Sequence, residues 1–144
     1  MQKTIFVLQG KSSVGKTTTI KKIYNLLINE LSAERVNANS EVLNKNDIRV
    51  ILKIDNVYIG IGSEGDPGSE LDKNLEIFVK NQCQIIICAC RTRGRTVDWI
   101  NKYSNEFKIK WIRKNPSNNQ DESNEKYAKE VVKSISSLIN VKHI

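Results

Sequence analysis

The stretch Gly10–Thr17, GKSSVGKT, decides the fold of this chain. It follows a short apolar run, Thr4–Gln9 (TIFVLQ), and precedes a segment in which apolar residues recur at helical spacing. The stretch therefore lies at a turn from a strand to a helix. Gly10 and Gly15 let the backbone curl without a Cβ in the way. Several N–H groups and the helix start can then face one anion, so the segment predicts a phosphate-binding loop.

With these glycines and the Lys-Thr pair that follows, the chain resembles the P-loop NTPase superfamily over residues 4–31. The resemblance implies that Lys16 adds charge near the β- and γ-phosphates and that the Thr17 hydroxyl coordinates Mg²⁺. A turn that matches by chance is the alternative. The residues expected to contact the nucleotide are Gly10, Lys11, Ser12, Ser13, Val14, Gly15, Lys16, Thr17 and Thr18.

Composition places the chain among globular proteins. Its 144 residues suit a single domain, residues 1–144, and 39% hydrophobic with 27% charged residues is ordinary for such a domain. No apolar run approaches the roughly 20 residues of a membrane span, and the first ten residues lack the features of a secretory signal. Three cysteines without C-x-x-C spacing indicate reduced thiols, which favours a cytoplasmic protein without a zinc site.

The charge is unevenly distributed. Residues 1–72 carry nine basic and nine acidic side chains, and residues 73–144 carry fourteen and seven, so the whole net charge of +7 lies in the second half. Solvated lysine-rich faces are one interpretation. A basic surface for an anionic substrate, phosphates or nucleic acid is the other.

The spacing of apolar residues predicts a helix over 16–31, followed by an irregular connection over 32–47 with a short helical turn near 41–45. Two apolar runs, 49–54 and 57–61, flank the polar pair Asp55-Asn56. They predict an antiparallel hairpin, with one longer bulged strand as the alternative.

The rest of the chain alternates between helix and strand patterns. We expect helices over 70–80, 96–103 and 125–138, strands over 84–90 and 107–113, and loops or linkers over 62–69, 91–95 and 115–124. The order predicts an α/β fold, a three-layer P-loop NTPase sandwich with helices on both faces of a mostly parallel five-stranded sheet and an antiparallel hairpin at 49–61.

Ligands of such folds bind at the carboxyl ends of the strands, where the loops 10–17, 62–69 and 91–95 should meet. P-loop enzymes pair the first loop with an acid on a neighbouring strand, which serves the metal ion. Asp55 falls at the opposite end of the sheet. We therefore expect Glu64, or less favourably Asp66, to serve Mg²⁺ together with Thr17; the alternative is that both acids are ordinary turn residues.

Three arginines follow the buried strand, in RTRGR (91–95). Arginine suits phosphate contacts and can neutralise charge on a transferring phosphoryl group. The segment looks similar to the arginine-bearing lid of small-molecule kinases, although it is much shorter. We expect a catalytic role for Arg91 and Arg93, with a solvated basic turn as the alternative.

The nucleotide is expected to be ATP. The N-K-x-D segment of guanine-specific members is missing after Cys90, and the connection 32–47 lacks the threonine of GTPase switches. The leading hypothesis is a Mg²⁺- and ATP-dependent enzyme, monomer or homodimer, that transfers or hydrolyses the γ-phosphate, with a kinase of a small-molecule phosphoacceptor favoured.

The runner-up is a nucleotide-dependent regulatory or assembly subunit whose basic second half contacts nucleic acid or an acidic partner. Trp99 and Trp111 could stack on bases of a single strand. Core packing is the commoner use of tryptophan at such spacing. No membrane contact is expected.

Overall fold

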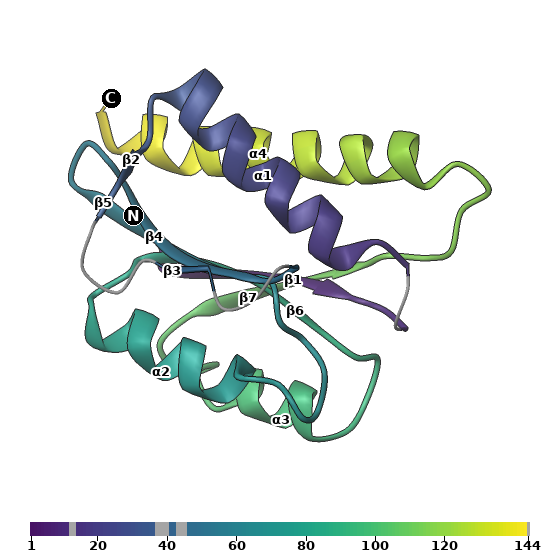
Figure 1. Ribbon diagram of the computed structural model, residues 1–144. Helices are drawn as coiled ribbons and strands as arrows, with labels where there is room; N and C mark the ends of the chain where they lie inside the picture. The colour runs from purple at the N-terminus through teal and green to yellow at the C-terminus, as the bar shows by residue number, and fades with distance from the viewer. Residues whose placement is uncertain (12–13, 37–40, 43–45, 144) are drawn as a thin grey trace.

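Strand β1 (Thr4–Gln9) lies inside the sheet, between β6 (Ile85–Cys90) and β7 (Lys108–Arg113), and pairs with both in parallel. The structure is a computed structural model that describes residues 1–11, 14–36, 41–42 and 46–143 (Figure 1). Four of the six residues of β1 are fully apolar, and the strand is buried on both faces, as its position requires.

Four helices flank this sheet in the described part of the chain: α1 (Lys16–Leu31), α2 (Leu71–Lys80), α3 (Arg95–Asn101) and α4 (Gln120–His143). Helices α1 and α4 cover one face, and α2 and α3 cover the other (Figure 1). Side chains of β1 alternate between these two layers, because successive residues of a strand point to opposite faces. Phe6 and Leu8 join the core beneath α1 and α4, and Ile5 and Val7 join the core beneath α2 and α3.

The hairpin prediction is confirmed. Strand β4 (Ile48–Ile54) pairs antiparallel with β5 (Val57–Gly62), and Asp55 turns the chain with a positive φ of 53°. Asp55 therefore lies at the edge of the sheet opposite the segment that follows β1, as expected. Strand β5 then pairs in parallel with β6, which brings its carboxyl end to the same edge as those of β1, β6 and β7.

The prediction of a mostly parallel sheet with five strands was wrong in the number of strands and in the number of antiparallel pairings. The described residues form a mixed seven-stranded sheet in the order β2-β4-β5-β6-β1-β7, with β3 paired to β4. The two additional strands, β2 (Glu34–Arg35) and β3 (Glu41–Val42), are two residues each and pair antiparallel with β4. Both lie in the connection that was predicted to be irregular. The prediction of a helical turn near 41–45 is wrong at Glu41–Val42, which form a strand. Residues 43–45 lie outside the described residues.

Helix α4 begins earlier than predicted, at Gln120 and not near Glu125. Asn119 precedes its first turn, where the Asn119 side-chain oxygen accepts a hydrogen bond from the Glu122 backbone N–H at 3.2 Å. This contact satisfies one of the backbone donors that a helix start leaves without a partner inside the helix. Residues 120–124 are all polar, so no spacing of apolar residues predicts a helix there. Their helical conformation depends on this cap and on the packing of α4 against α1.

Candidate functional site

Gly10 directly follows β1, at a position where the surrounding backbone leaves no room for a side chain. Its N–H donates to the Cys90 carbonyl at 3.1 Å, which ties the start of the loop to the end of β6. A Cβ on Gly10 would lie 2.5 Å from the Lys114 carbonyl oxygen, at the end of β7. The loop therefore leaves the sheet from between two neighbouring strand ends. Ser12 and Ser13 lie outside the described residues.

Gly15 starts helix α1 with φ +88°, a conformation that residues with a side chain rarely adopt. A Cβ there would lie 2.5 Å from Oδ1 of Asn124, a buried residue of α4. The Thr19 hydroxyl is 2.7 Å from the Gly15 carbonyl and 2.9 Å from Asn124 Oδ1. Asn124 was not singled out from the sequence, because only the packing of α1 on α4 brings it to the loop.

Lys16 is buried at the carboxyl edge of the sheet, with 8% of its surface exposed. Its Nζ donates to the carbonyls of Gly10 and, at 3.0 Å, of Cys90. Burial lowers the pKa of Lys16 and the nearby Arg91 lowers it further, whereas Asp66 and Cys90 act in the opposite direction. Two of the three ammonium protons are thus used within the protein, and the third can serve an anionic ligand.

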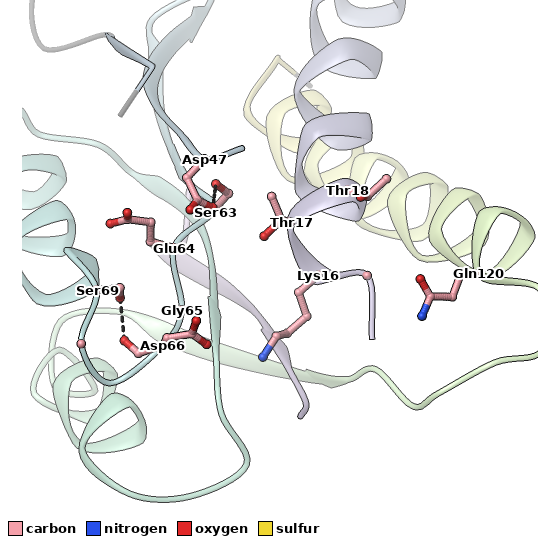
Figure 2. A pocket seen from close by; sticks show the side chains of 12 residues that line it. Lys16, Thr17, Thr18, Asp47, Ser63, Glu64, Gly65, Asp66, Ser69 and Gln120 are labelled. Atoms are coloured by element: carbon pink, nitrogen blue, oxygen red, sulfur yellow. Dashed lines mark hydrogen bonds between the residues drawn. The ribbon is translucent and has the colours of Figure 1, made fainter. Parts of the chain in front are cut away.

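An open cavity of about 820 Å³ adjoins this lysine (Figure 2). That volume lies within the range of roughly 300–1,000 Å³ that is common for small-molecule sites. The start of α1 forms one wall, and the segment after β5 forms much of the other. The residues that line it are Gly15, Lys16, Thr17, Thr18, Asp47, Ser63, Glu64, Gly65, Asp66, Gly68, Ser69 and Gln120.

Both predicted acids, Glu64 and Asp66, line the cavity, so the expected convergence of the first two loops is confirmed. Each is also held by the protein. Glu64 accepts a hydrogen bond from the Glu70 backbone N–H at 2.8 Å, just before α2. Asp66 accepts one from Arg91 Nε at 2.9 Å. Figure 2 shows the Glu64 side chain turned toward α2, away from Lys16 and Thr17.

The third loop meets the other two through Arg91. Its ion pair with Asp66 joins the end of β6 to the segment after β5, and its charge acts on Lys16. Arg93 is exposed and does not line the cavity. Neither arginine is among the residues that line the cavity, but the structure places Arg91 against Asp66, which does line it, and leaves Arg93 at the surface.

Four further polar residues of the cavity were not singled out from the sequence: Asp47, Ser63, Ser69 and Gln120. The Ser63 hydroxyl donates to Asp47 Oδ1 at 2.8 Å and accepts from the Ile48 N–H at 2.8 Å. Asp47 falls at the end of an asparagine-rich stretch without periodicity, so no sequence pattern marks it. Pairing of β4 with β5 places it beside Ser63.

Among the described residues, no group of three or more His, Cys, Asp or Glu side chains is placed to hold a metal ion by itself. Mg²⁺ beside a nucleotide needs fewer protein ligands, because phosphates and water supply most of its coordination. The hydroxyl and carboxylate oxygens of the cavity are hard ligands that fit this ion. Thr17 provides one such oxygen at the start of α1.

The three cysteines are free and buried. Cys90 contributes its carbonyl to Lys16, and burial raises the pKa of its thiol to about 11. A thiol with a raised pKa is protonated near neutral pH and is a weak nucleophile.

No described helix is long and apolar enough to cross a membrane.

No family model matches the chain, and comparisons with curated proteins and with solved structures also find no match.

Proposed function

We propose that this protein binds Mg²⁺-ATP in the cavity beside Lys16 and transfers or hydrolyses its γ-phosphate. The observation that carries the proposal is the position of Lys16, a buried ammonium group whose two hydrogen bonds go to the carbonyls of Gly10 and Cys90. The pattern GKSSVGKT and the turn from β1 to α1 support the same conclusion. A polyphosphate would supply the negative charge that this lysine lacks among its hydrogen-bond partners.

Other groups at the same edge would serve the reaction. The N-terminus of α1 favours anions through its dipole. Arg91 would neutralise charge on the transferring group while its Nε keeps the ion pair with Asp66, and Thr17 would coordinate Mg²⁺. Arg93, which is exposed, could join only if the segment 91–95 moved over the cavity.

Transfer to a small acceptor is favoured over hydrolysis, because the cavity extends beyond the start of α1 to the segment after β5. Incubation with radiolabelled ATP and a panel of nucleosides, nucleotides and sugars tests this preference. Label in one of these compounds supports a kinase, and equal hydrolysis with and without every compound contradicts it.

Substitution of Lys16 tests the binding site itself. Charged hydrogen bonds are worth about 1.5–3 kcal/mol, so Lys16→Ala should weaken Mg²⁺-ATP binding about 10- to 100-fold in calorimetry. Lys21→Ala, also on α1 but outside the cavity, is the matched control and should bind as the wild type does. Wild-type affinity in Lys16→Ala would refute the proposal, and so would absence of binding of both Mg²⁺-ATP and Mg²⁺-GTP by the folded wild type.

A second function is favoured by strand β7, an edge strand of the sheet. Lys108 and Arg113 are exposed on it, and Trp111 keeps 38% of its surface exposed, so the core packing expected for this tryptophan is incomplete. Trp99, by contrast, is partly buried against the core. A regulatory subunit could use the β7 edge to bind single-stranded nucleic acid. Affinity that falls steeply between low and moderate salt would support this function, and absence of binding at low salt would exclude it.

A further inference from the structure

The two acids predicted to serve the metal ion have other partners. Glu64 accepts the Glu70 backbone N–H at 2.8 Å, ahead of α2. Asp66 accepts Arg91 Nε at 2.9 Å, and 62% of its side chain is exposed. A metal ion would have to compete with the arginine for Asp66. The Glu64 side chain turns toward α2, away from Thr17 (Figure 2). Glu64 thus points away from the expected position of Mg²⁺, and Asp66 is already paired with a cation.

Asp47 is held differently, by a buried residue at the end of β5. Ser63 is 2% exposed, and its own N–H donates to the Ile48 carbonyl at 3.0 Å. Its hydroxyl oxygen accepts the Ile48 N–H at 2.8 Å and donates its only proton to Asp47 Oδ1 at 2.8 Å. Backbone pairing thus positions the hydroxyl, and the hydroxyl positions the carboxylate.

This arrangement lies across the cavity from the start of α1. Asp47 and Ser63 line the same cavity as Thr17, and Figure 2 shows the Thr17 hydroxyl on the side of α1 that faces them. The Ser63 oxygen has a second lone pair that the Ile48 N–H does not use. Two hydroxyls and one carboxylate, all of them hard oxygen ligands, therefore line the cavity that adjoins the expected phosphate position.

On the basis of the proposed function, we infer that Asp47, positioned by Ser63, is the carboxylate that holds the Mg²⁺ of the nucleotide opposite Thr17. Mg²⁺ keeps several water molecules, and Asp47 accepts hydrogen bonds from them. The carboxylate thus comes from the residue before the antiparallel strand β4, while the end of β5 supplies the hydroxyl that orients it. Glu64 and Asp66 remain with their structural partners.

The experiment compares ATP binding with Mg²⁺ and with EDTA, by calorimetry, in variants that lose a charge but keep their shape. Asp47→Asn should lose most of the gain in affinity that Mg²⁺ gives the wild type, about 10- to 100-fold as for other groups that orient a metal shell. Its affinity for ATP in EDTA should stay equal or rise, since a negative charge near the phosphates is removed. Ser63→Ala should lose part of the same gain.

Glu64→Gln and Asp66→Asn are the matched controls and should keep the Mg²⁺-dependent gain. Retention of the gain in Asp47→Asn, or its loss in either control, overturns the assignment of Asp47. Equal affinity of the wild type with and without Mg²⁺ also overturns it but leaves nucleotide binding intact. Absence of any nucleotide binding by the folded wild type refutes the proposed function itself. Thermal unfolding of each variant establishes that a loss of binding is not a loss of folding.

Discussion

Gly65 illustrates, at the scale of a residue, how the wall of the cavity is built. A Cβ on Gly65 would lie 2.6 Å from both the carbonyl carbon and oxygen of Ala89, inside any normal contact distance. The segment after β5 therefore packs directly on the backbone of β6. Gly68, three residues later, would meet nothing within 4 Å. Two glycines of one loop thus have different roles: one permits contact, and the other faces open space.

Substitution of these glycines gives a matched pair. Gly65→Ala should lower the free energy of unfolding by about 1–3 kcal/mol, because the backbone of the loop or of β6 must shift. Gly68→Ala should leave it unchanged or raise it by up to about 1 kcal/mol through the unfolded state. Urea denaturation of both variants measures the difference, and equal stability of the two would show that the loop does not rest on Ala89.

At the scale of an element, helix α4 packs against the end of the segment Gly10–Thr17 and the start of α1. It packs along α1, and its buried Asn124 contacts Thr19 and excludes a side chain at Gly15. The position of Asn124 depends on where α4 begins. The Asn119 side chain determines that point by accepting the Glu122 N–H, and its amide also lies 3.3 Å from Glu122 Oε2. Both contacts tie the Asn119 side chain to Glu122.

Loss of the cap should be measurable by itself. Asn119→Ala should lower the free energy of unfolding by about 1 kcal/mol, as for other N-cap residues. Asn118→Ala changes the neighbouring exposed asparagine and should cost less than about 0.5 kcal/mol. Thermal unfolding followed by circular dichroism compares them. A cost of Asn119→Ala no larger than that of Asn118→Ala would place the start of α4 elsewhere.

At the scale of the whole molecule, the strand order explains why distant segments form one site. β6 lies between β1 and β5, and all three run in parallel, so the loops that follow them leave the same edge. β6 is buried throughout, which places its two cysteines, Cys88 and Cys90, in the interior. Cys83 is buried just before the same strand.

Because these thiols are buried, we expect the free energy of unfolding to fall at alkaline pH. Burial raises the pKa of Cys83 from 9.0 to about 12 and that of Cys90 to about 11. Above pH 9 the unfolded chain loses these protons while the folded chain keeps them, so stability falls as pH rises toward the folded values. Each thiol contributes a decrease of at most about 1.4 kcal/mol per pH unit in this window.

Urea denaturation at about pH 8 and about pH 10.5 measures this decrease. Lysines titrate in the same window, so Cys83→Ala serves as the comparison. That variant should show a smaller decrease than the wild type, because one buried thiol is missing. An identical decrease in both proteins would mean that Cys83 does not ionise differently on unfolding.

The sequence by itself determined several helices and strands and drew attention to one side chain, Lys16. The bounds of β1 and α1 were predicted to the residue, the hairpin around Asp55 was confirmed, and Lys16 was identified because a glycine-containing turn between a strand and a helix is a local pattern. The short strands β2 and β3 and the start of α4 were missed, since they depend on pairing with β4 and on a cap.

Only the tertiary structure decided which polar groups share the cavity with Lys16. Asp47 and Ser63 are far apart in the chain, and no periodicity marks them; the antiparallel register of β4 and β5 makes them neighbours. Likewise, Arg91 pairs with Asp66 of the cavity whereas Arg93 is exposed, although both follow the same strand. Sequence spacing constrains residues within one turn or strand, whereas contacts across a sheet edge depend on strand order and register.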